Sequence, residues 1–496
     1  MRREVVSGTL WTTGASTGAQ AVAFIVTAIL AHLLLPSEFG LISMVLVFTG
    51  FAGLFVDMGL SAAVIQRHEL EERHLSSVFW VNVAAGLALA GLMTALAPAL
   101  SALYGEPRLI RLTYAISGNF LIASLVAVQM ALMIRRLNFR RLAIIDVSAT
   151  VISGVVAVAA ALMGLGVWSL VAQALTLSGS RAVLLWIASD WRPRWILERE
   201  AIRDLWGFSS NLAGFNALNY WVRNADNFLV GKFVGSAGLG IYGRAYNLML
   251  MPLAQISWVL SRVMFPVLSR MQKDTSRVKR SYLRAIGVIG LVTFPIVTGL
   301  FAVAEPFVLT VFGPRWESMV PVVQILCLAG LTQSVGTTTG WIYQSQGRTD
   351  WMFKWGLAAS AVTLVAFGIG ILWGVTGIAV AYAIRTVLLT YFNFSIPGRL
   401  IDMRFSEVVF ALRGVFVAAL VMSGGVFLLG LALPEDWPNA VRLAVEVAFG
   451  AVLYAALVAA FHVQPYRELK DIVRDWRRRR HAESELAAVS GALDPK

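Results

Sequence analysis

The sequence predicts an all-α membrane protein with about fourteen transmembrane helices: two pseudo-symmetric six-helix lobes around a central cavity, plus two C-terminal helices. Of its 496 residues, 58% are hydrophobic and only 14% are charged, and the mean hydropathy is +0.73. Soluble domains carry about a quarter of their residues as charged side chains, so a cytosolic or secreted globular enzyme and a disordered chain are excluded. The apolar runs are continuous rather than alternating over about ten residues, which excludes a β-barrel.

Fourteen segments are long enough to cross a bilayer as helices, which takes roughly 20 apolar residues each. The first follows Met1-Arg2-Arg3 and is predicted to be a membrane helix, because its apolar run is too long for a signal peptide. Glycine and proline mark the turns between segments. The predicted spans are 8–34, 40–65, 76–103, 109–133, 142–163, 167–189, 208–233, 239–268, 283–304, 318–343, 353–373, 375–395, 408–432 and 439–462.

The positions of the cations predict the orientation. Of the 41 Lys and Arg residues, 30 fall on the side that holds both termini, five fall on the opposite side and six lie within predicted spans. Cytoplasmic loops carry the excess of Lys and Arg, so both termini are expected in the cytoplasm. The net charge of +13 therefore reflects membrane topology, and no nucleic-acid partner is expected.

The longest loop, Ser189 to Trp206, mixes tryptophans with Arg and Glu and is expected to form an interfacial amphipathic helix. The basic tail that includes Arg477–Arg480 is expected to lie on anionic membrane lipid. The predicted divisions are an N-lobe 1–190, a linker 191–206, a C-lobe 207–395, additional helices 396–463 and a cytoplasmic tail 464–496.

The two halves of the chain resemble each other, which indicates an internal repeat. Ser37-Glu38-Phe39-Gly40-Leu41 aligns with Ala237-Gly238-Leu239-Gly240-Ile241. Gly166-Val167 likewise matches Gly374-Val375, and Arg181 and Arg385 occupy matching places in the sixth helix of each half. Repeats of six helices are typical of transporters that alternate access between two lobes. Chance similarity between apolar sequences is the alternative.

The motifs of several enzyme classes are absent from the sequence. It holds no G-x-x-x-x-G-K-[ST], no G-x-S-x-G and no H-E-x-x-H. Its single cysteine, Cys327, lies in an apolar stretch, and no Cys/His spacing suits a metal. We therefore expect neither catalysis nor a bound metal or cofactor.

Polar and charged residues inside predicted spans are expensive and mark candidate functional sites. They form stripes at three- to four-residue spacing in the first two helices of each half. Arg244 and Arg262 are 18 residues apart and therefore share one helix face, about 27 Å from each other. The candidates for substrate binding are Arg223, Arg244, Arg262, Asn216, Asn219, Asn227, Asn247, Gln255 and Gln20. The candidates for ion coupling or pairing are Asp57 and Asp226.

Each candidate also has a structural interpretation. Arg223 and Asp226 are spaced to form an ion pair on one helix. Arg244 and Arg262 either face a cavity or extend to the membrane surface from the helix ends. Asp57 either pairs with an arginine or titrates in proton coupling. Several arginines with few acids favour an anionic substrate, because guanidinium binds phosphate bidentately.

Several segments resemble the Wzx-type polysaccharide transporters, in particular the branch that is similar to colanic acid exporters. They are Leu35–Gly40, Asp57–Arg67, His74–Asn82, Arg136–Arg140, Leu239–Ala245 and Phe265–Arg270. The resemblance implies membership of the multidrug/oligosaccharidyl-lipid/polysaccharide (MOP) exporter superfamily, with a cavity lined by helices 1, 2, 7 and 8. It implies a flippase for undecaprenyl-pyrophosphate-linked oligosaccharide in the bacterial inner membrane, with a polymerase and a chain-length regulator as partners. Cavity acids leave room for H⁺ or Na⁺ coupling.

Two alternatives remain open at this stage. One is a drug or cation antiporter of the same superfamily, which would need acidic side chains facing the cavity. The other is a component of polysaccharide assembly that does not transport, either a polymerase or ligase or a scaffold.

Overall fold

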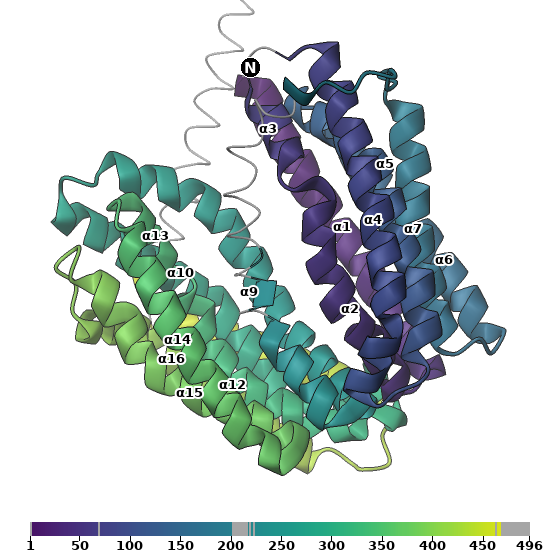
Figure 1. The fold of residues 1–496 in the computed structure, drawn as a ribbon. Helices are drawn as coiled ribbons and strands as arrows, with labels where there is room; N and C mark the ends of the chain where they lie inside the picture. The colour runs from purple at the N-terminus through teal and green to yellow at the C-terminus, as the bar shows by residue number, and fades with distance from the viewer. Residues whose placement is uncertain are drawn as a thin grey trace, which may run out of the picture. The chain divides into compact units, whose positions relative to one another are not determined.

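The computed structural model describes residues 2–67, 70–200, 217, 220–221, 224–461 and 464–467, and these contain helices and no strands. Figure 1 shows the helices with their labels. The first half of the chain holds α1 (Arg2–Leu33), α2 (Pro36–Asp57), α3 (Leu60–Gln66), α4 (Glu72–Tyr104), α5 (Leu109–Arg135), α6 (Phe139–Leu162) and α7 (Val167–Ala188). The second half holds α9 (Gly235–Arg270), α10 (Thr275–Ala302), α11 (Ala304–Val311), η1 (Pro314–Met319), α12 (Val320–Gly336), α13 (Thr339–Ser345), α14 (Thr349–Gly370), η2 (Ile371–Trp373), α15 (Gly374–Gly398), α16 (Phe405–Ala432) and α17 (Asn439–Ala460).

The all-helical membrane class is confirmed. Within the described part of the chain, 11 helical stretches are long and apolar enough to cross a membrane. One of them, Thr349–Gly398, has 50 residues and is long enough for two crossings. The predicted span 208–233 is described only in part, so fourteen crossings stays a prediction.

Two predicted spans are interrupted in the structure. The span 40–65 breaks between α2 and α3, where Met58 and Gly59 both have left-handed backbone, with φ of 47° and 81°. The carboxylate of Asp57 accepts hydrogen bonds from the Ser61 backbone N–H at 3.0 and 3.1 Å, which stabilises the break. The span 318–343 is interrupted between α12 and α13, where Thr337 and Thr338 keep right-handed backbone, with φ of −63° and −74°.

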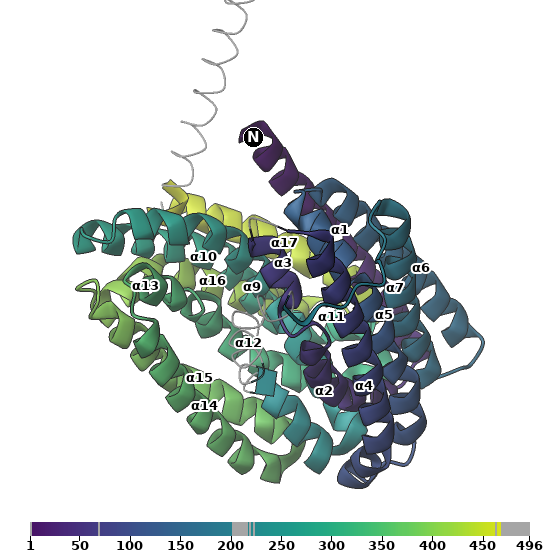
Figure 2. The same ribbon diagram turned by 45° about the horizontal axis from the view of Figure 1, so that its top comes forward.

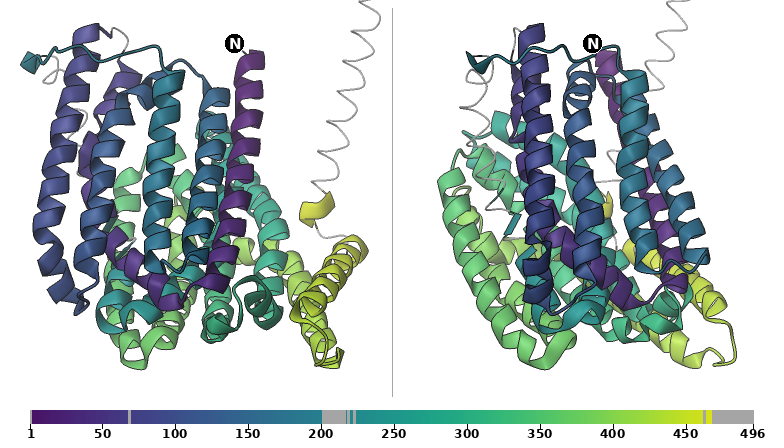
Figure 3. Two further views of the ribbon diagram at one scale, coloured as in Figure 1. Left: turned by 90° about the vertical axis from the view of Figure 1, so that its right-hand side faces the viewer. Right: turned by 45° about the vertical axis from the view of Figure 1, so that its right-hand side comes forward.

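The chain forms two compact units, and the lobe boundaries expected from the sequence stay a prediction. Unit 1 comprises 1–243, 311–316 and 371–375, and unit 2 comprises 244–310, 317–370 and 376–496. In unit 1, α4, α5, α7, α6 and α1 pack side by side in that order (Figure 3). In unit 2, α10 packs against α12 and α16, and α16 packs against α17 (Figure 2).

The expected amphipathic helix of the linker is wrong for its first part. Residues 189–198 are not helical, and a helix starts only at Arg199, while 201–206 lie outside the described residues. Pro193 disfavours a helix at the residue before it. Trp191 is buried instead, and Trp195 stacks on Trp80 with ring centroids 4.1 Å apart.

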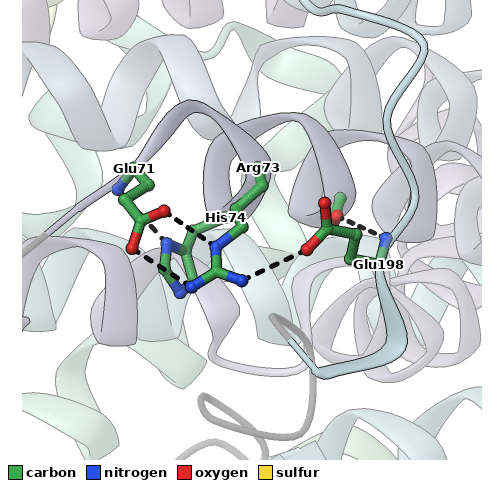
Figure 4. A network of polar contacts seen from close by, with 5 residues as sticks. Glu71, Arg73, His74 and Glu198 are labelled. Atoms are coloured by element: carbon green, nitrogen blue, oxygen red, sulfur yellow. Dashed lines mark hydrogen bonds and ion pairs between the residues drawn. The ribbon is translucent and has the colours of Figure 1, made fainter.

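The linker is held in an extended form against the start of α4. The backbone N–H groups of Arg194 and Glu198 donate to the hydroxyls of Ser76 and Ser77, at 3.0 and 2.9 Å. Figure 4 shows Arg73 between two carboxylates, 2.8 Å from Glu71 and 3.4 Å from Glu198. Serine hydroxyls therefore satisfy backbone groups that a helix would have paired internally.

We expect Ser77→Ala to lower the stability of the protein by about 1 kcal/mol, because it leaves the Glu198 N–H without its acceptor. Thermal unfolding of the purified full chain would measure the loss. Ser360→Ala is the matched control, since that exposed hydroxyl bonds only to the Gly356 carbonyl of its own helix. Equal melting temperatures for the two variants would contradict this role of the linker.

Candidate functional site

The seventh predicted span, 208–233, is referred to as helix 7 and is distinct from α7. Its predicted polar stripe is only partly described. Asn216, Asn219 and Arg223 lie outside the described residues. Asn227 is half-buried and its backbone N–H donates to the carboxylate of Asp226 at 2.8 Å. Both interpretations of Arg223 and Asp226, an ion pair and a substrate-binding group, therefore stay predictions.

An aromatic cluster ties this helix to α2 within unit 1. The Tyr220 hydroxyl lies 3.1 and 2.8 Å from the carbonyls of Leu46 and Val47. Trp221 packs on Phe48 and Phe51, with ring centroids 5.9 and 5.3 Å apart. Tyr220 and Trp221 therefore commit part of this helix to packing against α2.

Asp226 is buried, at 6% exposure, inside unit 1. The Tyr242 hydroxyl donates to its Oδ2 at 3.2 Å. Tyr242 belongs to the first turns of α9, so this hydrogen bond joins two helices of the predicted cavity lining. A buried carboxylate is costly unless it is hydrogen-bonded or protonated, and both responses are available here.

Asp57 has a clear local function at the end of α2. In addition to the Ser61 backbone N–H, the Ser61 hydroxyl donates to its Oδ1 at 2.7 Å and the Asn82 amide donates at 3.2 Å. Its described partners are thus neutral groups of α3 and α4 rather than an arginine. The carboxylate fixes the break between α2 and α3.

The stripe of α9 carries the other candidates. Arg244 and Gln255 are half-buried, whereas Asn247 is exposed. The backbone of Arg262 belongs to α9, but its side chain lies outside what the structure describes. Gln20, on α1, is half-buried. Arg244 and Arg262 both belong to α9, 18 residues apart, and their shared face stays a prediction.

The other cations of the predicted spans differ in their surroundings. Arg181 on α7 lies 2.9 Å from Asp146 on α6. Arg413 is exposed, and its guanidinium carbon lies 3.7 Å from the centroid of the Phe410 ring. Arg385 lines a cavity in unit 2. Among the described side chains, no three His, Cys, Asp or Glu groups lie close enough to share a metal ion.

The backbones of α2 and α9 approach each other so closely that only glycine fits. A Cβ on Gly40 would lie 1.7 Å from the Ser236 carbonyl oxygen, and a Cβ on Gly240 would lie 1.9 Å from the Pro36 carbonyl oxygen. These are the two glycines that the repeat aligned. They are not among the predicted site residues, although their alignment in the repeat carried the signal.

Two further contacts of unit 1 also join the two sequence halves. The Trp316 indole N–H donates to the Ala31 carbonyl at the end of α1, at 3.0 Å. The Lys232 ammonium, at the end of helix 7, donates to the Leu103 carbonyl at the end of α4. In each half, the end of the third predicted span or the segment after it thus bonds to the first span of the other half, which supports the internal repeat.

This chain is similar to proteins that are named for polysaccharide biosynthesis. A family model described as polysaccharide biosynthesis protein matches residues 29–321. The teichuronic acid biosynthesis protein TuaB of Bacillus subtilis (strain 168) is 27% identical, with 94% of this chain and 98% of that protein covered. The succinoglycan biosynthesis transport protein ExoT of Rhizobium meliloti (strain 1021) is 28% identical, with 98% and 97% covered.

Two solved structures share the fold. The lipid II flippase MurJ in an inward closed conformation has a TM-score of 0.74 at 14% identity, with 93% of this chain and 99% of that chain covered. An inward-facing multidrug resistance transporter of the MATE family, in the MOP superfamily, has a TM-score of 0.61 at 14% identity, with 77% and 94% covered. The fold expected from the resemblance is confirmed.

We expect Gly40→Ala and Gly240→Ala each to cost about 3 kcal/mol or more, because the new methyl meets a backbone carbonyl that cannot move alone. Thermal unfolding and the yield of folded protein in detergent would measure this loss. Gly118→Ala is the control: it also lies inside a helix, and a Cβ there would meet nothing within 4 Å. Equal stability of Gly40→Ala and Gly118→Ala would contradict the close approach.

Proposed function

The chain belongs to the polysaccharide biosynthesis protein family, and we propose that it is a flippase for lipid-linked oligosaccharide. The cargo would be an undecaprenyl-pyrophosphate-linked precursor of lipopolysaccharide or exopolysaccharide. The observation that carries the proposal is the match, over nearly the whole of both chains, to relatives named for polysaccharide biosynthesis and transport. The shared fold with a lipid II flippase supports transport rather than catalysis.

We assign pyrophosphate binding to the cationic stripes. Arg223, Arg244 and Arg262 would supply guanidinium groups, which match phosphate geometry bidentately. The amides would hydrogen-bond the sugar hydroxyls; they are Asn216, Asn219, Asn227, Asn247, Gln255 and Gln20. A drug or cation exporter would need carboxylates in these places, so the chemistry of these side chains favours an anionic cargo.

The proposed setting is the bacterial inner membrane, with both termini in the cytoplasm and transport by alternating access. The chain would act as a transporter rather than an enzyme. Polysaccharide polymerase and the chain-length regulator would receive the flipped product, so they are the expected protein partners.

We also propose that a proton or Na⁺ drives the cycle, and Asp226 is the stronger candidate for coupling. Its carboxylate is buried, with a tyrosine hydroxyl as its partner from another helix. Asp57 is the weaker candidate, because four hydrogen bonds from Ser61 and Asn82 hold its carboxylate as part of a helix break. Changing the protonation of Asp226 would alter the contact between helix 7 and α9.

Replacement of Arg223 and Arg244 together by alanine should reduce flipping of lipid-linked oligosaccharide at least tenfold, because each charge-assisted hydrogen bond contributes about 1.5–3 kcal/mol. The assay follows access of a labelled lipid-linked oligosaccharide to an external reagent in reconstituted vesicles. Arg413→Ala, which removes an exposed cation, should leave the rate unchanged. Unchanged flipping by the double variant would reject the site, and export of cationic dyes with no polysaccharide defect on deletion would favour an antiporter.

Asp226→Asn should remove the dependence of flipping on a proton or Na⁺ gradient, because an amide of equal size cannot change its protonation. The measurement compares transport with and without each gradient in the same vesicles. Asp57→Asn should retain the gradient dependence even where its stability falls. Gradient-dependent flipping by Asp226→Asn would exclude Asp226 as the coupling group.

A further inference from the structure

A polar cavity of about 250 Å³ lies within unit 2, where α12, α14 and α15 meet. Figure 2 shows α14 and α15 side by side. The cavity wall carries one cation, Arg385, together with amides, threonine hydroxyls and the aromatic rings of Trp355 and Tyr382. Arg385 lies near the middle of α15, so the cavity is deep in the membrane-spanning part of the chain.

Among the described residues, no carboxylate balances the charge of Arg385, since those that line the cavity include neither Asp nor Glu. Its Nη2 lies 3.5 Å from the Ala359 carbonyl oxygen, and its guanidinium carbon lies 5.8 Å from the centroid of the Tyr382 ring. Arg385 is half-buried, and its Nε is buried with no hydrogen-bond partner among the described residues. A guanidinium with so few acceptors inside a membrane-spanning helix is expensive unless an anion or water reaches it.

The matching arginine of the first half shows the contrast. Arg181 has an ion-pair partner in Asp146, on the preceding helix, at 2.9 Å. Arg385 contacts the preceding helix, α14, at Ala359, which offers only its backbone oxygen. The repeat has therefore kept the cation in both halves and the anion in only one.

Hydrogen bonds join the other side chains of the cavity wall and leave further donors. The Tyr382 hydroxyl donates to Gln333 Oε1 at 3.0 Å, which leaves the Gln333 amide as a donor. The Trp355 indole donates to Asn393 Oδ1 at 3.2 Å, and the Asn393 amide donates to the Gly336 carbonyl at 3.2 Å. These bonds fix the aromatic and amide side chains around Arg385.

We propose that this cavity binds one phosphate-type oxyanion on Arg385 and Gln333, a site separate from the stripes assigned to the transported lipid. The planar guanidinium fork suits an oxyanion. The volume equals that of roughly eight water molecules, enough for one phosphate group with a few waters and too small for a pyrophosphate-linked oligosaccharide. The oxyanion would be either free phosphate or the phosphate of an anionic lipid.

The test uses the purified full chain in nanodiscs of neutral phosphatidylcholine, in gluconate buffer, with radiolabelled inorganic phosphate as the probe in equilibrium dialysis. Wild type should bind phosphate saturably. Arg385→Gln should weaken binding at least tenfold. The matched control is Asp146→Asn with Arg181→Gln, which removes the mid-span arginine of the first half without leaving a charge behind and should bind like wild type.

A second variant separates a lost site from a lost fold. Ala359→Asp places a carboxylate beside Arg385 and reproduces the pairing of Arg181, so it should keep the wild-type melting temperature and lose phosphate binding. A second set of discs contains phosphatidylglycerol and no free phosphate, and native mass spectrometry counts the retained lipid. Retention that depends on Arg385 would assign the oxyanion to lipid. The proposal is wrong if neither probe binds, or if Arg385→Gln binds both as wild type does.

Discussion

The structure of unit 1 depends on the contact between α2 and α9 at Gly40 and Gly240. Each glycine faces the other helix, and a Cβ added to it would clash with a backbone carbonyl there. This approach is possible for no residue larger than glycine, and it joins equivalent helices of the two sequence halves. The packing of the neighbouring elements follows, because Phe39, directly beside Gly40, packs edge-on against Trp316 with centroids 5.3 Å apart.

A charged group in a membrane-spanning helix needs compensation, and three kinds occur in this chain. Arg181 is paired with the carboxylate of Asp146. Arg413 is exposed and lies over an aromatic ring, and Asp57 accepts from the backbone and side-chain donors of a helix break. An ionisable residue inside a membrane span is by default a candidate functional group. The carboxylate of Asp57 takes part in a helix break, and that of Asp226 accepts from Tyr242 and Asn227. Arg385 has no carboxylate partner among the described residues.

The sequence could predict most of the helices because a bilayer imposes one length and one polarity on every crossing. The break at Met58-Gly59 was missed although most of its signal is local: Gly59 has a positive φ, and Asp57 accepts mainly from Ser61, with Asn82 of α4 adding one bond. The helix predicted for the linker was wrong for another reason: Trp191 and Trp195 have amphipathic spacing, but their partners Glu72 and Trp80 lie on α4. In the linker, long-range partners therefore overruled local periodicity.

The candidate site shows the same division. The stripes of helix 7 and α9 follow from helical periodicity, which needs no partner, so their residue spacing was available from the sequence. The role proposed for Arg385 could not be predicted from the sequence. Arg181 and Arg385 look equivalent in the alignment, and the difference is whether a carboxylate of the preceding helix contacts the arginine. A repeat makes such a difference informative: Arg181 has a carboxylate partner, whereas Arg385 has the Ala359 carbonyl and the Tyr382 ring, and a bound anion would complete its compensation.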